Sequence, residues 1–534
     1  MARSSRFRGL PAGVALNAAI AGVLASAIAW LGPPGVDAAA HVYQRALFLQ
    51  HGFQLWNNYW YAGRYSFVSY SLLYYPLAAV VGIKLLAVAT ASVAAAAFAA
   101  IAARDWPSAG VWPARSFSVV AAASVLTGAF PYALGFACAL VALWAIGGRR
   151  LWLFAIAVAL AFAASPLAFV LLLIVLVSIV VAGRMPIPAG ALAAVITVAA
   201  VGLIVWRLFP DGGSFPFPVS ELLSVLVFCG LGVAFTKGVR SARTLTAFFV
   251  VYGVSALVCF IVPSAIGGNI ARLRFVAIPV ALLALSLRRW RPVVPTAAMM
   301  ALAAAWNLSP LALGAVRSDS DPSANAAYWT PAVHFLRPRL TPSYRVEVVD
   351  TADHWEAAYL PEQGIPIVRG WFRQDDFPQN ALLYGRLVGS RYVRWLRSLG
   401  VAYVVLTDAP VDYSAVREAE LLRHGVPGLA LAVKTAHVRI YAVKDPTGIV
   451  TGATGAHVAR LLPAGLTASL PQAGRYRIAT RYSPYWSASF GCVTRTPDGM
   501  TQLTVRHGGT VRLAIRVTAA GSLRTLLGLQ ADCR

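Results

Sequence analysis

The sequence around Gly35-Val36-Asp37-Ala38-Ala39-Ala40-His41 places a carboxylate shortly after the first long apolar segment, residues 12 to 32. Asp37 is one of only four acidic residues among the first 314. A carboxylate at the mouth of a membrane-spanning bundle is costly to keep near hydrocarbon, which favours a functional role. The alternative is an ordinary loop aspartate that caps a helix beginning at Ala38.

The composition predicts a polytopic membrane protein. Of the 534 residues, 59% are hydrophobic and only 12% are charged, which is too apolar for a soluble protein of this size. Before residue 315 the only carboxylates are Asp37, Asp105, Asp211 and Glu221, and the other 16 of the 20 follow. This break predicts a membrane module over residues 1 to 314 and a water-soluble arm after it.

The formal net charge of +25 would suggest a nucleic-acid partner in a soluble protein. Here most basic residues of the first arm lie between apolar segments, where they set orientation in the membrane. We therefore predict membrane lipid and no nucleic acid as a partner. Arginine and alanine are abundant and lysine is nearly absent, which is typical of high-GC bacteria.

We predict eleven spans near residues 12 to 32, 85 to 103, 117 to 128, 132 to 147, 151 to 164, 166 to 183, 187 to 208, 221 to 236, 244 to 262, 275 to 288 and 293 to 314. Fourteen basic residues then fall on the side of the N-terminus, which carries Arg3, Arg6 and Arg8, and five fall on the other side. The bias predicts a cytoplasmic N-terminus in a bacterial inner membrane and an extracytoplasmic C-terminal arm. A twelfth span at residues 66 to 82 would invert every later loop. We therefore assign that segment to an interfacial or re-entrant helix in a first outer loop, residues 33 to 84.

The sequence pattern of the C-terminal arm predicts two subdomains. Residues 345 to 350, 365 to 371 and 401 to 407 are typical of strands, and residues 389 to 399 of a helix ended by Gly400, which indicates an α/β subdomain over 315 to 445. Residues 446 to 534 are rich in strand patterns at 475 to 478, 501 to 505 and 511 to 517, with a turn at His507-Gly508-Gly509. We expect a β-sandwich there.

The five cysteines show no paired metal-ligand spacing. Cys492 and Cys533 lie in the C-terminal arm, where an oxidising compartment would allow a disulfide between them. Two unpaired thiols are the alternative.

These features together resemble the GT-C superfamily of integral-membrane glycosyltransferases. The resemblance consists of an aspartate after the first span, a following helix that carries His41, the segment Leu72-Leu73-Tyr74-Tyr75-Pro76-Leu77, and an extracytoplasmic C-terminal domain. Asp37-x3-His41 and the Tyr-Tyr-Pro-Leu segment are most similar to a bacterial membrane family labelled as related to 6-pyruvoyl-tetrahydropterin synthase. These two specific segments of the resemblance lie within residues 35 to 77, and the rest of the resemblance is architectural.

The resemblance implies transfer of a sugar from a polyprenyl-phosphate donor to an envelope glycan or glycolipid acceptor, usually with inversion. It assigns to Asp37 the role of general base on the acceptor hydroxyl, which can supply roughly 10² to 10⁴ in rate. Many relatives carry two adjacent acidic residues here, whereas this chain has Val36-Asp37. We therefore predict no certain cofactor, and the sequence supports a divalent metal only weakly. By analogy, the sugar is arabinose or mannose.

Phosphate binding requires positive charge where negative charge develops. Arg272 and Arg274 lie in a predicted outer segment, and the arginine fork can hold two phosphate oxygens. Snorkelling to lipid headgroups is the alternative for both. Arg64 is a further candidate, for phosphate or for a salt bridge with Asp37. His41, one helical turn after Asp37, is a candidate for orienting the carboxylate, contacting phosphate or joining a metal site.

Sugar or acceptor contacts are predicted at Asn57, Trp60, Tyr61, His354 and Trp371. Tryptophan and tyrosine also concentrate at bilayer interfaces without binding anything, and we favour that interpretation for most of the aromatic residues of segment 56 to 65. The polar segments 353 to 356 and 370 to 376 either line an acceptor cavity or form a solvated surface, and we favour the surface. A transporter or flippase and a non-catalytic envelope scaffold are the alternative functions.

Overall fold

The computed structural model describes residues 12–183, 186–210 and 213–529. The chain forms two compact units. The helical unit comprises Met1–Ala38, Ser71–Gly202 and Ser214–Asp319, and the mixed unit comprises Ala39–Tyr70, Leu203–Gly213 and Ser320–Arg534. Among the residues predicted to matter, Arg3, Arg6, Arg8, Arg184, Asp211 and Cys533 lie outside the described ranges.

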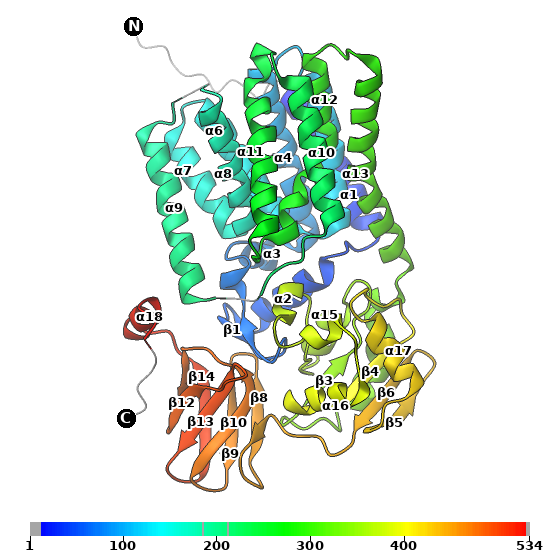
Figure 1. Ribbon diagram of the computed structural model, residues 1–534, viewed down its shortest axis with the longest axis vertical. Helices are drawn as coiled ribbons and strands as arrows, with labels where there is room; N and C mark the ends of the chain where they lie inside the picture. Colours follow the sequence, from blue (N-terminus) through cyan, green and yellow to red (C-terminus); the bar gives the residue numbers. More distant parts are fainter. Residues whose placement is uncertain (1–11, 184–185, 211–212, 530–534) are drawn as a thin grey trace. The chain divides into compact units, whose positions relative to one another are not determined.

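Eight helices are long and apolar enough to cross a membrane, counted over the described residues. The helices that match the predicted spans, long and short, are α1 (Ala12–Leu31), α4 (Ile83–Asp105), α5 (Val111–Ala123), α6 (Phe130–Gly147), α7 (Leu151–Ala164), α8 (Pro166–Val181), α9 (Ala189–Leu208), α10 (Val219–Thr236), α11 (Arg243–Ile261), α12 (Ala277–Leu287) and α13 (Val293–Ser320). Every predicted span therefore coincides with a helix (Figure 1). The three that fall short of the crossing length are Val111–Thr127, Leu151–Ala164 and Pro166–Val181.

The helical unit has several small cores built largely from alanine, leucine and phenylalanine. In one of them α8, α10, α11, α12 and α13 meet around buried Phe228, Phe249 and Tyr252. Segment 66 to 82 contains only a 3₁₀ turn and the short helix α3 (Tyr74–Val81), and Gly82 at φ 88° separates α3 from α4. The segment therefore contains less helix than its apolar composition suggests.

The mixed unit contains the predicted α/β subdomain. Its sheet has the order β3 (Arg345–Val348), β4 (Val401–Thr407), β6 (Val438–Val443), β5 (Leu429–Lys434), with only β3 and β4 parallel. The helices of this part are α14 (Thr330–Leu336), α15 (Glu356–Glu362), α16 (Gly389–Ser398) and α17 (Val416–His424). The predicted strand at 365 to 371 is wrong, because that segment makes only an isolated bridge from Ile367 to Val346.

Two four-stranded sheets form the predicted β-sandwich. One has the order β12 (Cys492–Arg495), β13 (Met500–Val505), β10 (Gly474–Arg481), β7 (Val450–Thr451). The other has the order β11 (Trp486–Ala488), β14 (Gly509–Ile515), β9 (Gly465–Leu470), β8 (His457–Leu462). The turn before β14 joins the two sheets, and the sequence did not predict the terminal helix α18 (Ala519–Leu526). Cys492 is disulfide-bonded.

The first loop belongs with the C-terminal arm, which differs from the predicted boundary. It comprises α2 (Ala38–His51) and the hairpin of β1 (Trp56–Asn57) and β2 (Arg64–Tyr65). Trp56 and Tyr65 pack in the core of the β-sandwich, and the side-chain amide of Asn58 donates to the carbonyls of Leu462 and Gly465 at 2.9 and 3.1 Å. The expected interfacial belt is therefore wrong for this pair, because both rings are needed to fill a protein core.

Candidate active site

Asp37 lies in a tight loop that is held against the end of α5. The backbone N–H groups of Val36 and Asp37 donate to the carbonyls of Leu126 and Thr127 at 3.3 and 2.9 Å. The accepting carbonyls belong to Ser124–Thr127, a 3₁₀ turn that continues α5. Asp37 is thus held by its backbone immediately before α2, which begins at Ala38 as predicted.

Gly128 makes this close approach possible. Its φ is +67°, and a Cβ there would lie 2.7 Å from the amide nitrogen of Ala38 and 2.9 Å from that of Asp37. Any other residue would push the loop away and strain its own backbone. The local sequence Thr127-Gly128 therefore fixes the position of Asp37 as much as the residues around Asp37 do.

The two predicted phosphate-binding arginines lie on one 3₁₀ segment of the helical unit, Gly267–Val276. Ile270, Ala271 and Leu273 point into the core, which leaves Arg272 and Arg274 half-buried. The hydroxyl of Tyr252 donates to the carbonyl of Ile270 and accepts from the N–H of Leu273 at 3.0 Å. This buried tyrosine therefore holds the segment in register.

Each arginine already has partners. The Arg272 guanidinium lies 4.5 Å from the ring centre of Tyr132 and donates to the side-chain oxygen of Asn269 at 3.2 Å. Arg274 forms an ion pair of 2.6 Å with Glu221. The charges of both Glu221 and Asp37 act on Arg274. Asp37 and Arg274 belong to the same unit, and their joint action on a substrate stays a prediction.

Both guanidinium groups keep some capacity to bind a ligand. Their Nε atoms are buried and have no hydrogen-bond partner among the described residues. A buried, unsatisfied donor costs about 1–3 kcal/mol, so an anion that accepted from it would be stabilised. This observation favours a bound anion over simple snorkelling, in which the nitrogen atoms would reach water or lipid headgroups.

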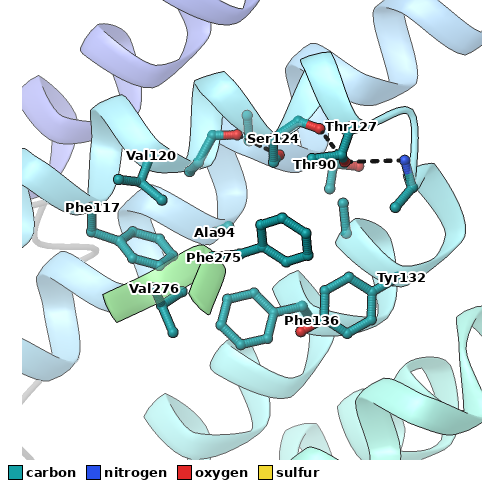
Figure 2. Close-up of a pocket in the computed structure, with 14 residues that line it drawn as sticks. Thr90, Ala94, Phe117, Val120, Ser124, Thr127, Tyr132, Phe136, Phe275 and Val276 are labelled. Atoms are coloured by element: carbon teal, nitrogen blue, oxygen red, sulfur yellow. Dashed lines mark hydrogen bonds between the residues drawn. The ribbon is translucent and has the colours of Figure 1, made fainter. Parts of the chain in front are cut away.

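An apolar cavity of about 50 Å³ lies beside these residues, within the helical unit. Figure 2 shows its lining, which includes Tyr132, Phe136 and Phe275 on one side and Thr90 and Thr127 on the other. Tyr132 also carries Arg272 on its face, and Thr127 binds the backbone of Asp37. The cavity is therefore contiguous with the residues that hold both predicted functional groups.

Two predicted residues of the mixed unit, His41 and Trp371, lie close together. The His41 ring is completely buried, 5.9 Å from the ring of Tyr70 and 6.2 Å from that of Trp371. Arg64, by contrast, forms a buried ion pair of 2.6 Å with Asp375 and lies 4.1 Å from the ring centre of Phe372. The carboxylate of Asp375 therefore competes with phosphate for the guanidinium group of Arg64.

The residues predicted to touch a sugar are mostly core residues. Trp60 is fully buried and its indole N–H donates to the carbonyl of Ala357 at 2.9 Å. Asn57 is fully buried and accepts from the backbone N–H of Tyr59 at 2.9 Å. Tyr61 is 2% exposed. The side chains of all three are buried, and the amide nitrogen of Asn57 has no hydrogen-bond partner among the described residues, so a sugar contact at Asn57 stays a prediction.

Segments 353 to 356 and 370 to 376 are largely buried, and their assignment to a solvated surface is wrong. His354 lies among carboxylates, and Arg369 makes ion pairs with Asp350 at 2.6 Å, Asp376 at 3.3 Å and Glu418 at 3.6 Å. Burial raises the pKa of Asp350 to about 6, of Glu418 to about 7 and of Glu356 to about 8. Burial acts to lower the pKa of His354, but the surrounding carboxylates outweigh it and raise the pKa to about 9.

Sequence reasoning missed Glu221, Tyr132 and Tyr252 in the helical unit. Glu221 had a usable signal, because it is one of so few carboxylates before residue 315. The two tyrosines had none, since each lies in an apolar helix where an aromatic residue is unremarkable. Their roles follow from residues far away in sequence.

Neither a protein-family model nor a curated protein matches the chain. Two solved structures of the arabinofuranosyltransferase AftD from Mycobacteria, one of a mutant, resemble it with TM-scores of 0.47 and 0.46 at 17% and 14% identity. They match 88% and 95% of this chain, which spans only 41% and 60% of theirs.

The oligosaccharyltransferase AglB from Archaeoglobus fulgidus, solved with an inhibitory peptide and a dolichol-phosphate, has a TM-score of 0.43 at 13% identity. The match covers 73% of this chain and 69% of AglB. All three TM-scores lie below 0.5, so the functional argument rests on the residues of this chain.

Proposed function

We propose that the helical unit transfers a sugar from a polyprenyl-phosphate donor to a hydroxyl of an envelope glycan or glycolipid. Asp37 accepts the proton of the attacking hydroxyl, and Arg272 and Arg274 bind the phosphate that leaves. The observation that carries the proposal is that the Nε atoms of Arg272 and Arg274 are buried without a hydrogen-bond partner among the described residues, in the unit that also contains Asp37. The reaction needs a proton acceptor and a cation, and these residues supply both.

The half-buried arginines suit a phosphodiester donor. The Nε–H groups of both arginines are available to donate to a ligand. Arg272 is held by Asn269 and Tyr132 and has no carboxylate partner among the described residues. Glu221 balances the charge of Arg274 when no phosphate is bound. The small apolar cavity beside Tyr132 offers the first carbons of a prenyl chain a non-aqueous environment.

The test uses the full chain reconstituted in liposomes with labelled polyprenyl-phosphate-linked arabinose or mannose and a glycan acceptor. We expect label in the acceptor with the wild-type protein, and a loss of roughly 10² to 10⁴ in rate with Asp37→Asn. Asp105→Asn is the matched control, because Asp105 pairs with Arg104 at 3.1 Å in the same unit. This control should transfer at the wild-type rate.

The same liposomes separate the alternatives. Movement of intact labelled donor across the bilayer without label in the acceptor would indicate a flippase and contradict the proposal. Transfer that is equal in wild type and Asp37→Asn would remove Asp37 from the mechanism.

A further inference from the structure

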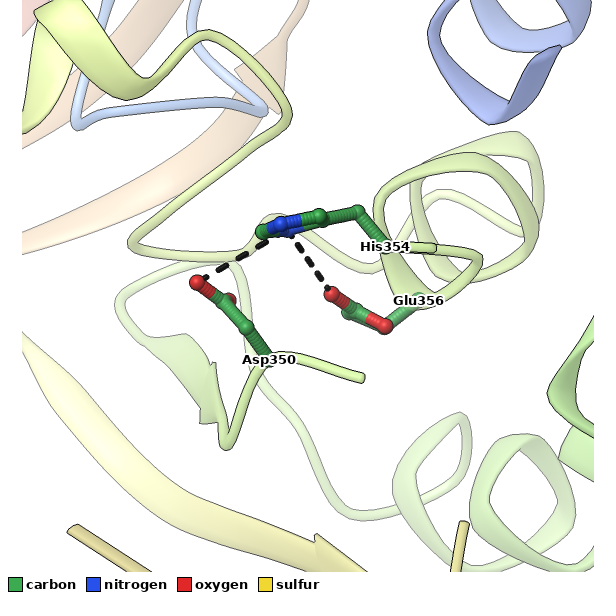
Figure 3. Close-up of side chains that lie close together, drawn as sticks. All are labelled: Asp350, His354 and Glu356. Atoms are coloured by element: carbon green, nitrogen blue, oxygen red, sulfur yellow. Dashed lines mark ion pairs between the residues drawn. The ribbon is translucent and has the colours of Figure 1, made fainter. Parts of the chain in front are cut away.

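The mixed unit holds a second cluster of charged side chains that the transfer reaction does not use. Asp350, His354 and Glu356 lie between β3 and the first turn of α15, and Figure 3 shows the two carboxylates directed at the same imidazole ring. The three side chains are 3%, 9% and 1% exposed. Their nearest ligand atoms all lie within 4.8 Å of one another.

The distances are too long for hydrogen bonds and close to those around a metal ion. His354 Nδ1 lies 3.5 Å from Glu356 Oε1 and 3.7 Å from Asp350 Oδ2, whereas N–H···O bonds are about 2.7–3.2 Å long. Two ligands at about 2.1 Å from one tetrahedral ion are about 3.4 Å apart. Glu356 Oε1 and His354 Nδ1 are buried with no hydrogen-bond partner among the described residues.

Glu356 and His354 are each held at the atom that faces away from their mutual contact. The hydroxyl of Thr351 donates to Glu356 Oε2 at 2.6 Å, which leaves Oε1 directed at the imidazole. His354 Nε2 faces Asp412 at 3.7 Å. Metal-bound histidines usually direct their second nitrogen at a carboxylate in this way. Arg369 pairs at 2.6 Å with Asp350 Oδ2, the same oxygen that faces His354 Nδ1, so an ion would share this carboxylate with the guanidinium group.

The charge of the cluster also attracts a cation. Among the described residues, Asp350, Glu356, Asp376, Asp412 and Glu418 form ion pairs with only two guanidinium groups, those of Arg369 and Arg373, and with His354. Buried charges need compensation, because desolvation is costly. A proton on His354 offsets one negative charge, whereas a dication offsets two and requires the imidazole to be neutral.

We infer that Asp350, His354 and Glu356 bind one divalent cation of the class that accepts both imidazole nitrogen and carboxylate oxygen, such as Zn²⁺ or Mn²⁺. His354 supplies Nδ1, and Asp350 and Glu356 supply one oxygen each. The site belongs to the mixed unit. It stabilises the turn in which His354 adopts a φ of 57°.

The test measures metal in the purified full-length protein. The protein is treated with EDTA, incubated with Zn²⁺ or Mn²⁺ alone, separated from free ion and analysed by mass spectrometry. We expect about one ion per chain in wild type and a rise in the melting temperature on metal addition. Glu356→Gln, which keeps the shape of the side chain, should lower the affinity at least tenfold.

His437→Asn is the matched control, because His437 also pairs with a carboxylate, Asp408 at 2.9 Å, but on the surface. This variant should bind metal as the wild type does. Less than about one ion per ten wild-type chains with either metal would overturn the inference. Equal binding by wild type and Glu356→Gln would overturn it too, since the ion would then lie elsewhere.

Discussion

The two charged clusters of this protein use similar side chains in opposite proportions. In the helical unit Arg272 and Arg274 share one ion-paired carboxylate among the described residues, Glu221, and their buried Nε donors have no hydrogen-bond partner there. Around His354 the mixed unit gathers five carboxylates about two guanidinium groups, and the buried atoms without a hydrogen-bond partner include Glu356 Oε1 as well as nitrogens of Arg369 and Arg373. The first balance suits an anion and the second a cation.

The largest effect is expected from removing both cations of the helical unit. Arg272→Gln combined with Arg274→Gln should lower kcat/KM for sugar transfer roughly 10²- to 10⁴-fold, because each charge-assisted hydrogen bond contributes about 1.5–3 kcal/mol. Arg115→Gln, at an exposed arginine of the same unit, should change it less than about twofold. An equal loss of kcat/KM in the double variant and in Arg115→Gln would show a general effect on membrane insertion.

The reverse experiment removes a cation from the carboxylate-rich cluster. Arg369→Gln should lower the stability of the mixed unit by roughly 3–5 kcal/mol, because it leaves buried carboxylates without their partner. The melting temperature of the full-length protein in detergent should fall by about 6 °C or more. Arg477→Gln, which breaks the exposed pair with Asp498 at 2.6 Å, should lower it by only about 2 °C. Similar shifts in both variants would contradict the difference between buried and exposed pairs.

A smaller effect of opposite sign is expected at Glu221. Glu221→Gln removes the carboxylate that competes with phosphate for Arg274, so donor affinity should rise about two- to fivefold, the range of a partly exposed ion pair. Isothermal titration with polyprenyl phosphate measures this directly. Weaker donor binding in the variant would mean that Glu221 orients Arg274 and does not compete with the ligand.

The helices and several strands were predictable because their signals are local. Continuous apolar runs predicted the helices of the helical unit, and Val401–Thr407 was predicted to the residue, since Gly400 ends the preceding helix at φ 78°. The boundary at residue 314 was less accurate, because α13 continues to Ser320.

The clusters themselves depend on long-range contacts. Asn58 bonds to Leu462, 404 residues away, and the aromatic segment around it therefore fills a core that local sequence cannot reveal. Glu221 and Arg274 are 53 residues apart. Asp37 and the two arginines were predicted from their position after apolar segments, whereas the carboxylates around His354 were assigned to a surface because polar density alone does not reveal burial.

The role of Asp37 is tested most directly by a single-turnover measurement with donor already bound, which separates proton transfer from donor binding. Wild-type and Asp37→Asn proteins are saturated with labelled polyprenyl-phosphate sugar and mixed with excess acceptor. We predict equal donor occupancy and transfer that is roughly 10² to 10⁴ times slower in the variant. Transfer by Asp37→Asn within about threefold of the wild-type rate would contradict the assignment of Asp37 as the base.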